Sequence, residues 1–260
     1  MERLLSRPRM SKYWSLLVFS ALFMSTVSCN YAQDIQMWSS SFVEMQIKSK
    51  STVSLEKGLS ALKTEELIAK LETDQEKKSF WINIYNGFII KKIRANPESY
   101  QKRSSFFSKR DIPIAGQLFS FDDIEHVILR KQQWKYGLGF VNKPFVSKLF
   151  EALSVNKLDS RIHFALNCGA KSCPPTRVYQ LARIEEQLNT AQRHFIENTS
   201  IIRDNKVELS RLFLWYKGDF ESKSAILKLV QQNSSKDLKS EQIKYSPYYW
   251  DIDLNNYILD

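Results

Sequence analysis

The sequence predicts an α+β fold that is mainly helical, with a small, largely antiparallel sheet. Stretches with helical periodicity outnumber the few short stretches that alternate like strands. Hydrophobic residues make up 43% of the 260 residues and aromatic residues 13%, which is enough to build a substantial core. This composition argues against a disordered chain.

The N-terminal stretch has the order of a bacterial export signal. Basic residues come first, an apolar run at 14–24 follows, and small residues precede Cys29. The run is about half the roughly 20 residues that a membrane-spanning helix needs. The sequence Thr-Val-Ser-Cys resembles the lipobox of bacterial lipoproteins, although Thr26 replaces the usual leucine. We expect a lipoprotein-type signal peptide at residues 1–28 and lipidation at Cys29, or else ordinary cleavage and secretion.

Export places the protein in the cell envelope, at the periplasmic or outer-membrane face, or outside the cell if Cys29 carries no lipid. Acyl chains would hold it on a membrane without a spanning helix. The net charge is +10, but lysines and arginines are interleaved with acids, which is typical of a solvated basic surface. The expected partners are the membrane and an unidentified protein or envelope ligand, and no nucleic acid.

Behind the signal, residues 29–55 are predicted to be an N-terminal segment with a first amphipathic helix from Asp34 to Ile47. A second helix is predicted over Thr64 to Leu71, with acids in its first turn. Residues 56–260 are predicted to form a single globular domain, because no linker rich in Pro, Gly or Ser and no repeat interrupts them.

The longest helical pattern runs from Glu76 to Ala95 and ends at an Asn-Pro pair. The face opposite its apolar stripe carries Asn83 and Asn86 instead of charges, which predicts a helix buried on all sides. A buried carboxamide without a hydrogen-bond partner costs about 1 to 3 kcal/mol. We therefore expect both amides to join the helix to neighbouring loops or to contact a ligand directly.

Residues 112–119 predict a small hairpin around an Ala-Gly turn, and Ser120 then begins a helix. Asp122 and Asp123 fit capping and helix-dipole roles in its first turn. Glu125 and His126 follow. Neighbouring helical positions point about 100° apart, so we expect these two side chains to serve different partners, as site residues or as core residues.

The stretch RIHFALNCGAKSCPP, at 161–175, begins with strict alternation and ends in turn-forming residues. A strand over 161–167 would place His163 and Asn167 on one face, beside a small residue that leaves space. That arrangement is typical of a functional site and also of a polar-edged core strand.

Cys168 and Cys173 bracket a loop that two prolines stiffen. In an oxidising compartment this spacing favours a local disulfide. A thiol nucleophile activated by His163 or His126 is the alternative, because catalysis needs a thiolate near a base. No ligand spacing points to a zinc site, and nothing indicates a cofactor.

The C-terminal part predicts architecture more than chemistry. A helix is expected over Ala182 to Asn198 and a hairpin over 201–209. The aromatic residues that follow are expected in the core rather than in a carbohydrate platform; they are Phe213, Trp215, Tyr216 and Phe220.

Four motifs together resemble the domain-of-unknown-function 547 (DUF547) family. They are FWINIYN at 80–86, FSFDDIEHVILR at 119–130, RIHFALNCGAKSCPP at 161–175 and YYWDIDLNN at 248–256. They occur in the family's order and span nearly the whole chain after the signal. Because no activity is established for this family, the resemblance implies a fold and a set of characteristic residues but no reaction.

A distant similarity to papain-like and transglutaminase-like folds is a further expectation, by analogy. Those folds combine a nucleophile at a helix N-terminus with a histidine on a strand, and His163 fits the strand position. The long helix offers Asn83 and Asn86 and no cysteine, so a standard triad does not carry over.

Two hypotheses follow for the function. The first is an envelope protein, lipid-anchored or secreted, that binds a partner or ligand. The second is a thiol-dependent hydrolase or acyltransferase that uses Cys168 or Cys173 with His163 or His126. A disulfide between the cysteines favours the first hypothesis, and a reactive thiol favours the second.

Overall fold

The computed structural model describes residues 35–203, 206–234 and 242–259. The α-helices are α2 (Val53–Ala61), α3 (Thr64–Ala69), α4 (Asp74–Ala95), α5 (Arg103–Ser108), α6 (Lys148–Leu153), α7 (Ile184–Thr199), α8 (Leu212–Trp215) and α9 (Lys223–Gln232). Short helical segments of other types are η1 (Pro97–Gln101), η2 (Asp123–Leu129), η3 (Ser160–Phe164), η4 (Leu181–Arg183) and η5 (Lys217–Phe220). The strands are β1 (Ile112–Ile114), β2 (Gln117–Phe119), β3 (Ile201–Arg203), β4 (Lys206–Leu209) and β5 (Ile243–Tyr245).

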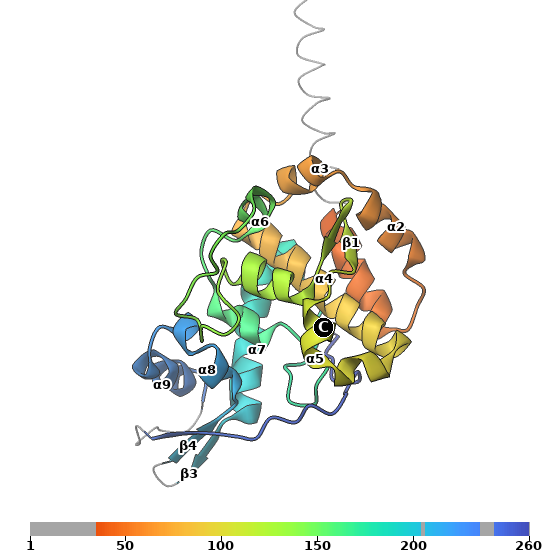
Figure 1. The fold of residues 1–260 in the computed structure, drawn as a ribbon. Coiled ribbons are helices and arrows are strands. Elements are labelled where there is room, and N and C mark those ends of the chain that lie inside the picture. Colours follow the sequence, from red (N-terminus) through yellow and green to blue (C-terminus); the bar gives the residue numbers. More distant parts are fainter. Residues whose placement is uncertain (1–34, 204–205, 235–241, 260) are drawn as a thin grey trace, which may run out of the picture.

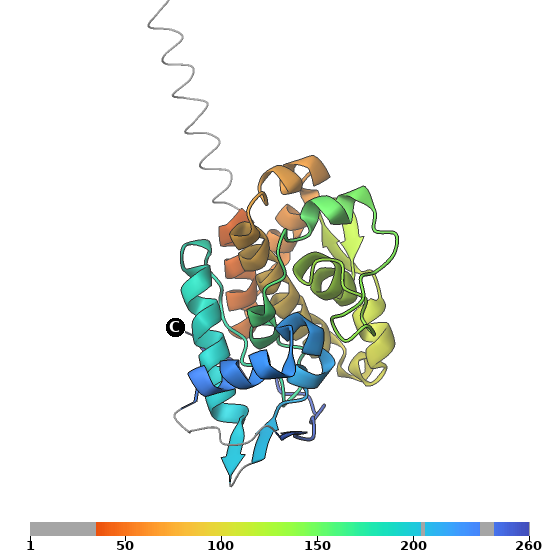
Figure 2. The same ribbon diagram turned by 90° about the vertical axis from the view of Figure 1, so that its left-hand side faces the viewer.

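The predicted α+β class is confirmed. Strands β1 and β2 pair as an antiparallel hairpin, and β3, β4 and β5 form a mixed sheet in which β5 runs parallel to β4. Figure 1 places the hairpin and the mixed sheet at opposite ends of the molecule, and the quarter-turn view in Figure 2 agrees. Helices supply most of the packing between these ends.

Helix α4 is the centre of the larger core, as its sequence predicts (Figure 1). A reciprocal capping box fixes its start, because Thr73 Oγ1 accepts from the Glu76 amide (3.2 Å) and Glu76 Oε2 accepts from the Thr73 amide (2.8 Å). The predicted first helix is present through residues 35–47 and packs closely on α4. A Cβ at Gly87 would lie 2.5 Å from the Phe42 ring, so this approach depends on the glycine.

Asn83 and Asn86 join α4 to two separate loops. Asn83 exchanges two hydrogen bonds with the backbone of Tyr179, donating to its carbonyl (2.7 Å) and accepting from its amide (2.9 Å). Asn86 likewise donates to the carbonyl of Ala165 (2.9 Å) and accepts from the amide of Asn167 (2.9 Å). Each carboxamide thus supplies hydrogen bonds to one buried amide and one buried carbonyl, in the way that a backbone partner would.

A second core forms around the C-terminal half of α7, the β3–β4 hairpin, α8 and α9. The predicted helix over 182–198 corresponds to η4 and α7, and the predicted hairpin is present on both sides of residues 204–205, which lie outside the described part. Phe213 and Phe220 are core residues as predicted. Trp215 and Tyr216 are partly buried, pack against this core and also line a cavity.

The predicted strand over 161–167 was also wrong. Residues Ser160–Phe164 form the 3₁₀ helix η3, which packs against α7. Asp159 caps it by accepting from the Arg161 amide (3.1 Å), and the Arg161 side chain pairs with Asp159 and with Glu185 of α7. These local and tertiary bonds outweigh the alternating pattern, and no strand of the described residues pairs with this segment.

Among the described residues, no helix has the length and apolar composition that crossing a bilayer requires. The predicted signal peptide and Cys29 lie outside the described residues.

Replacing Asn83 with Ala should destabilise the fold by about 3 kcal/mol, because the amide and carbonyl of Tyr179 would stay buried without partners. Urea unfolding measures the change. The matched control is Asn156→Ala in the exposed loop after α6, where, among the described residues, only the backbone amide is hydrogen-bonded and we expect a change within about 0.5 kcal/mol. Equal losses in the two variants would contradict the structural role of Asn83.

Candidate functional site

A cavity of about 470 Å³ lies where η2, α8 and the loop containing the two cysteines meet α4. Its wall combines aromatic rings with a few ionisable groups. The lining residues include Tyr85, Asp122, Glu125, His126, Lys135, Tyr136, Leu138, His163, Cys168, Cys173, Trp215, Tyr216, Tyr248 and Trp250. Segments far apart in the sequence therefore share one pocket, which is typical of a ligand-binding or catalytic site.

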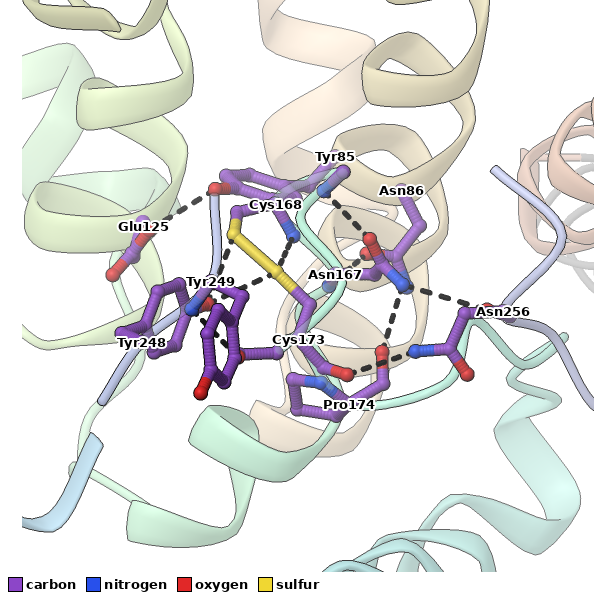
Figure 3. The surroundings of a disulfide bond; sticks show 12 residues. Tyr85, Asn86, Glu125, Asn167, Cys168, Cys173, Pro174, Tyr248, Tyr249 and Asn256 are labelled. Atoms are coloured by element: carbon purple, nitrogen blue, oxygen red, sulfur yellow. Dashed lines mark hydrogen bonds between the residues drawn. A yellow bond between two sulfur atoms is a disulfide. The ribbon is translucent and has the colours of Figure 1, made fainter. Parts of the chain in front are cut away.

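Glu125 is a buried carboxylate held between two tyrosines. It accepts hydrogen bonds from the Tyr216 hydroxyl (2.5 Å) and the Tyr85 hydroxyl (3.2 Å; Figure 3). Burial works to raise the pKa of Glu125, yet its pKa lies below the ordinary value, because the Tyr216 hydrogen bond and the positive charge of Arg130 oppose the effect of burial. Glu125 is therefore ionised at neutral pH.

Both tyrosines stay protonated and donate. Burial, together with the negative charge of Glu125, raises the pKa of Tyr85 and of Tyr216 well above the ordinary value of 10. Their hydroxyls therefore act as fixed neutral donors to the carboxylate.

Glu125 and His126 line the same cavity but have different partners, as predicted: Glu125 bonds to Tyr85 and Tyr216, whereas His126 bonds to Arg130. Residues Asp123–Leu129 form a π-helix, which has more residues per turn than the predicted α-helix, so neighbouring side chains lie closer in angle and both can face the cavity. The reciprocal bonds between Ser120 and Asp123 start this helix as the sequence predicts. The closest approach of the two side chains, His126 Nδ1 to Glu125 Oε1, is 3.7 Å, so they do not share a hydrogen bond.

His126 is a neutral ring in the wall of the cavity. Arg130 Nη1 lies 2.9 Å from His126 Nδ1, and because a guanidinium only donates, Nδ1 accepts and the ring proton is on Nε2. That nitrogen is 3.6 Å from Asp122 Oδ1. Burial is the largest effect and lowers the pKa of His126.

His163 is held by a carboxylate that sequence reasoning missed. Asp219 Oδ2 lies 2.7 Å from His163 Nε2, and Arg130 donates to both Asp219 oxygens (2.6 and 3.0 Å). Burial opposes ionisation of Asp219, but its bonds from His163 and Arg130 lower its pKa to about 2. The His163 ring stacks on Tyr216 at a centroid distance of 3.9 Å.

The bond to Asp219 fixes the tautomer of His163. A carboxylate accepts, so Nε2 carries the proton and Nδ1 is left as the basic nitrogen. Burial lowers the pKa of His163 in spite of Asp219, which keeps the ring neutral at pH 7. A neutral imidazole oriented by a carboxylate can accept a proton from a bound group.

Cys168 and Cys173 form a disulfide in the cavity wall, with a sulfur–sulfur distance of 2.21 Å (Figure 3). The Tyr248 hydroxyl lies 3.3 Å from one sulfur and 3.2 Å from the other. The C-terminal segment also binds this loop through its backbone, with the Lys171 amide donating to the Asp251 carbonyl (2.8 Å). The last residues of the described chain therefore close one side of the cavity.

Asn167 supports the same loop from behind. It accepts from the amide of Gly169 (2.7 Å) and donates to the carbonyl of Pro174 (2.7 Å). Figure 3 shows it between Asn86 and Asn256, away from Glu125. Asn83, Asn86 and Asn167 are not among the residues that line the cavity.

The structure thus brings together five of the predicted site residues: Glu125, His126, His163, Cys168 and Cys173. Sequence reasoning missed Arg130, Asp219 and the tyrosines. Arg130 follows His126 by four positions, a spacing that would have indicated their contact. Asp219 carries no such signal, because it is 56 residues from His163. No group of three or more His, Cys, Asp or Glu side chains in the described ranges is arranged to hold a metal ion.

Comparison with known proteins gives one family. The family described as "Protein of unknown function, DUF547" matches residues 68–196, which include Tyr85, Glu125, both cavity histidines and both cysteines. No curated protein and no solved structure matches the chain.

Protonation of His126 should destabilise the fold at mildly acidic pH. Its pKa is lowered in the folded protein from the ordinary value of 6.5. Below about pH 6.5 the unfolded chain therefore binds a proton that the folded chain does not, and the free energy of unfolding falls by up to about 1.4 kcal/mol per pH unit for such a group. His163 acts in the same direction.

Urea unfolding between about pH 7.5 and about pH 5 measures this slope. We expect His126→Gln, which keeps an acceptor for Arg130, to flatten it. The control His194→Gln changes a histidine of α7 that does not line the cavity, and should leave the slope unaltered. An unchanged slope in His126→Gln would show that His126 does not titrate with folding.

Proposed function

Because the chain belongs, through residues 68–196, to the DUF547 family of proteins of unknown function, we propose its function from the cavity. We propose an exported envelope protein, lipid-anchored at Cys29 or secreted, whose cavity binds a small ligand with a positively charged group and an apolar body. The single observation that carries the ligand class is the ionised Glu125 in an aromatic wall.

The charges around the cavity leave Glu125 without a cationic partner. Arg130 is committed to Asp219 through two hydrogen bonds, and Lys135 Nζ contacts both oxygens of Asp122 (2.7 and 3.1 Å). Glu125 receives only neutral tyrosine donors. A buried carboxylate gains most from a charge-assisted hydrogen bond, so an ammonium group is the complementary ligand group.

The rest of the wall suits an apolar body. Trp215, Tyr248 and Trp250 pack against one another at centroid distances of 4.8 to 5.9 Å and line the cavity together. Aromatic faces attract cations and bury apolar surface. Tyr216 is not available for this, because His163 stacks on it and the Arg130 guanidinium lies 4.7 Å from its ring centroid.

Export is supported by the residues before Cys29 and by the disulfide. Disulfides persist in the periplasm and outside cells and are rare in the cytosol. The loop between Cys168 and Cys173 is also fixed by the C-terminal segment, which suits a structural role for the bond. Both points favour the binding function over a thiol enzyme.

A thiol-dependent hydrolase or acyltransferase is the second candidate. It is favoured by the position of His126 and His163 in the same cavity wall as both cysteines. A reductant would first have to convert the disulfide to two thiols, after which a thiolate could attack an acyl group with His163 as the base.

Phenethylamine, which has an ammonium group and an aromatic body, tests the proposed ligand class. Phenethyl alcohol, which has the same body without the charge, is the comparison ligand. We expect the amine to change the tryptophan emission saturably, because Trp215 and Trp250 line the cavity. Glu125→Gln should weaken amine binding by at least about tenfold, the size of one charge-assisted bond. Glu151→Gln, on the exposed surface of α6, is the control. Equal binding of amine and alcohol would overturn the proposed charge recognition.

The intact mass of the protein from the membrane fraction, alkylated without reductant, separates the two candidates. We expect the mass of acyl chains at Cys29 and no alkylation of Cys168 or Cys173, because both are in a disulfide. Two free thiols, one alkylating much faster than the other, would put the thiol enzyme first and direct the next substitution to His163→Ala.

A further inference from the structure

The segment 131–148, between η2 and α6, exposes an unusual number of large apolar side chains. Phe145 is fully exposed and Tyr136 is 67% exposed. The exposed set within the segment is Trp134, Tyr136, Leu138, Phe140, Val141 and Phe145. In Figure 1 the segment runs along the left-hand side, below α6. Large apolar side chains that are exposed together within one short segment are typical of an interaction site.

The backbone of the segment is held in place, so these side chains are presented outward by a defined loop. The Trp134 amide donates to the Val141 carbonyl (2.7 Å) and the Lys143 amide to the Gln132 carbonyl (2.7 Å). The Gly218 amide of η5 donates to the Leu138 carbonyl (2.7 Å), which ties the loop to the body of the protein.

All the charged side chains of the segment are positive. Lys131, Lys135, Lys143 and Lys148 lie in it, and no Asp or Glu occurs between Glu125 and Glu151. Lys135 pairs with Asp122. The other three lysines are exposed, and none of them forms an ion pair with another described residue.

We propose that residues 131–148 form a membrane-docking loop for an anionic lipid surface. Trp, Tyr and Phe side chains insert at the boundary between headgroups and acyl chains, and the lysines reach the phosphates around them. Each lysine near an anionic surface adds electrostatic attraction to it. A protein partner fits less well, because lysine is depleted in protein interfaces, where aromatic side chains are paired with arginine instead.

The proposed lipid at Cys29 would hold Ile35 close to a bilayer and so raise the local concentration of the loop at its surface. Cys29 is six residues before the first described residue, Ile35, and six residues span at most about 20 Å. This step rests on the proposed anchor, whereas the apolar and basic character of the loop does not.

Docking would also place the opening of the cavity at the membrane. Tyr136 and Leu138 belong to the loop, are exposed, and line the cavity at the same time. Because these two residues are exposed and also line the cavity, they lie where the cavity opens to solvent. A ligand would therefore enter from the headgroup region of the bilayer.

Trp134 is a built-in probe for this proposal. The purified full chain is reconstituted into phosphatidylcholine vesicles with and without phosphatidylglycerol, with acyl chains brominated to quench tryptophan on contact. The difference between wild type and Trp134→Phe isolates the emission of this one residue. We expect loss of the Trp134 emission in the brominated anionic vesicles and little loss in the purely zwitterionic ones.

Lys131→Gln/Lys143→Gln/Lys148→Gln should retain the Trp134 emission in anionic vesicles. Lys63→Gln/Lys102→Gln/Lys228→Gln is the matched control, with the same net charge and three exposed lysines removed elsewhere. Trp134 emission that is insensitive to brominated lipid, or equally affected by both triple variants, would overturn the proposal. So would a dimer in detergent solution that Phe140→Ser/Phe145→Ser dissociates, since the loop would then bind a second copy.

The mass at Cys29 keeps this test separate from the proposed anchor. Quenching of Trp134 in a protein without acyl chains would support docking by the loop alone. An acylated protein whose Trp134 is not quenched would overturn the loop proposal and leave the anchor intact.

Discussion

The buried ion pair between Arg130 and Asp219 is the interaction on which the cavity depends. Both side chains are fully shielded from solvent, and their two hydrogen bonds join the end of η2 to η5. Removing one member of such a pair leaves a buried charge and typically costs about 3 to 5 kcal/mol. Arg130 also fixes the tautomer of His126, and Asp219 that of His163. One pair thus sets the protonation pattern of both histidines in the cavity.

The elements that sequence predicts well are those that local chemistry determines. The all-round burial of α4 and the hairpin over 112–119 follow from neighbouring residues. So does the reciprocal cap between Ser120 and Asp123, because its partners lie within one helical turn. The same reasoning predicted that amides on α4 would join it to loops, although it could not say which loops.

The errors lie where distant contacts decide the local structure. Alternation over 161–167 favours a strand, but Asp159 and Glu185 bind Arg161 and hold the chain as η3 against α7. The π-helix that turns Glu125 and His126 toward one cavity has no comparable signal in the sequence. Asp219 was missed because its role exists only after η5 packs against η2. Functional sites often depart from local preferences in this way.

The charges of the cavity also explain why an apolar pocket and a basic loop belong together. Lys135 pairs with Asp122 and Arg130 with Asp219, whereas Glu125 receives hydrogen bonds only from neutral tyrosines. A singly charged cation would balance the charge of Glu125, whereas an anion would add a second buried negative charge. The exposed lysines lie outside, on the loop whose Tyr136 and Leu138 line the opening. The proposed attraction to an anionic surface and the proposed recognition of a cation thus depend on different residues, on opposite sides of the cavity wall, and each should be alterable without the other.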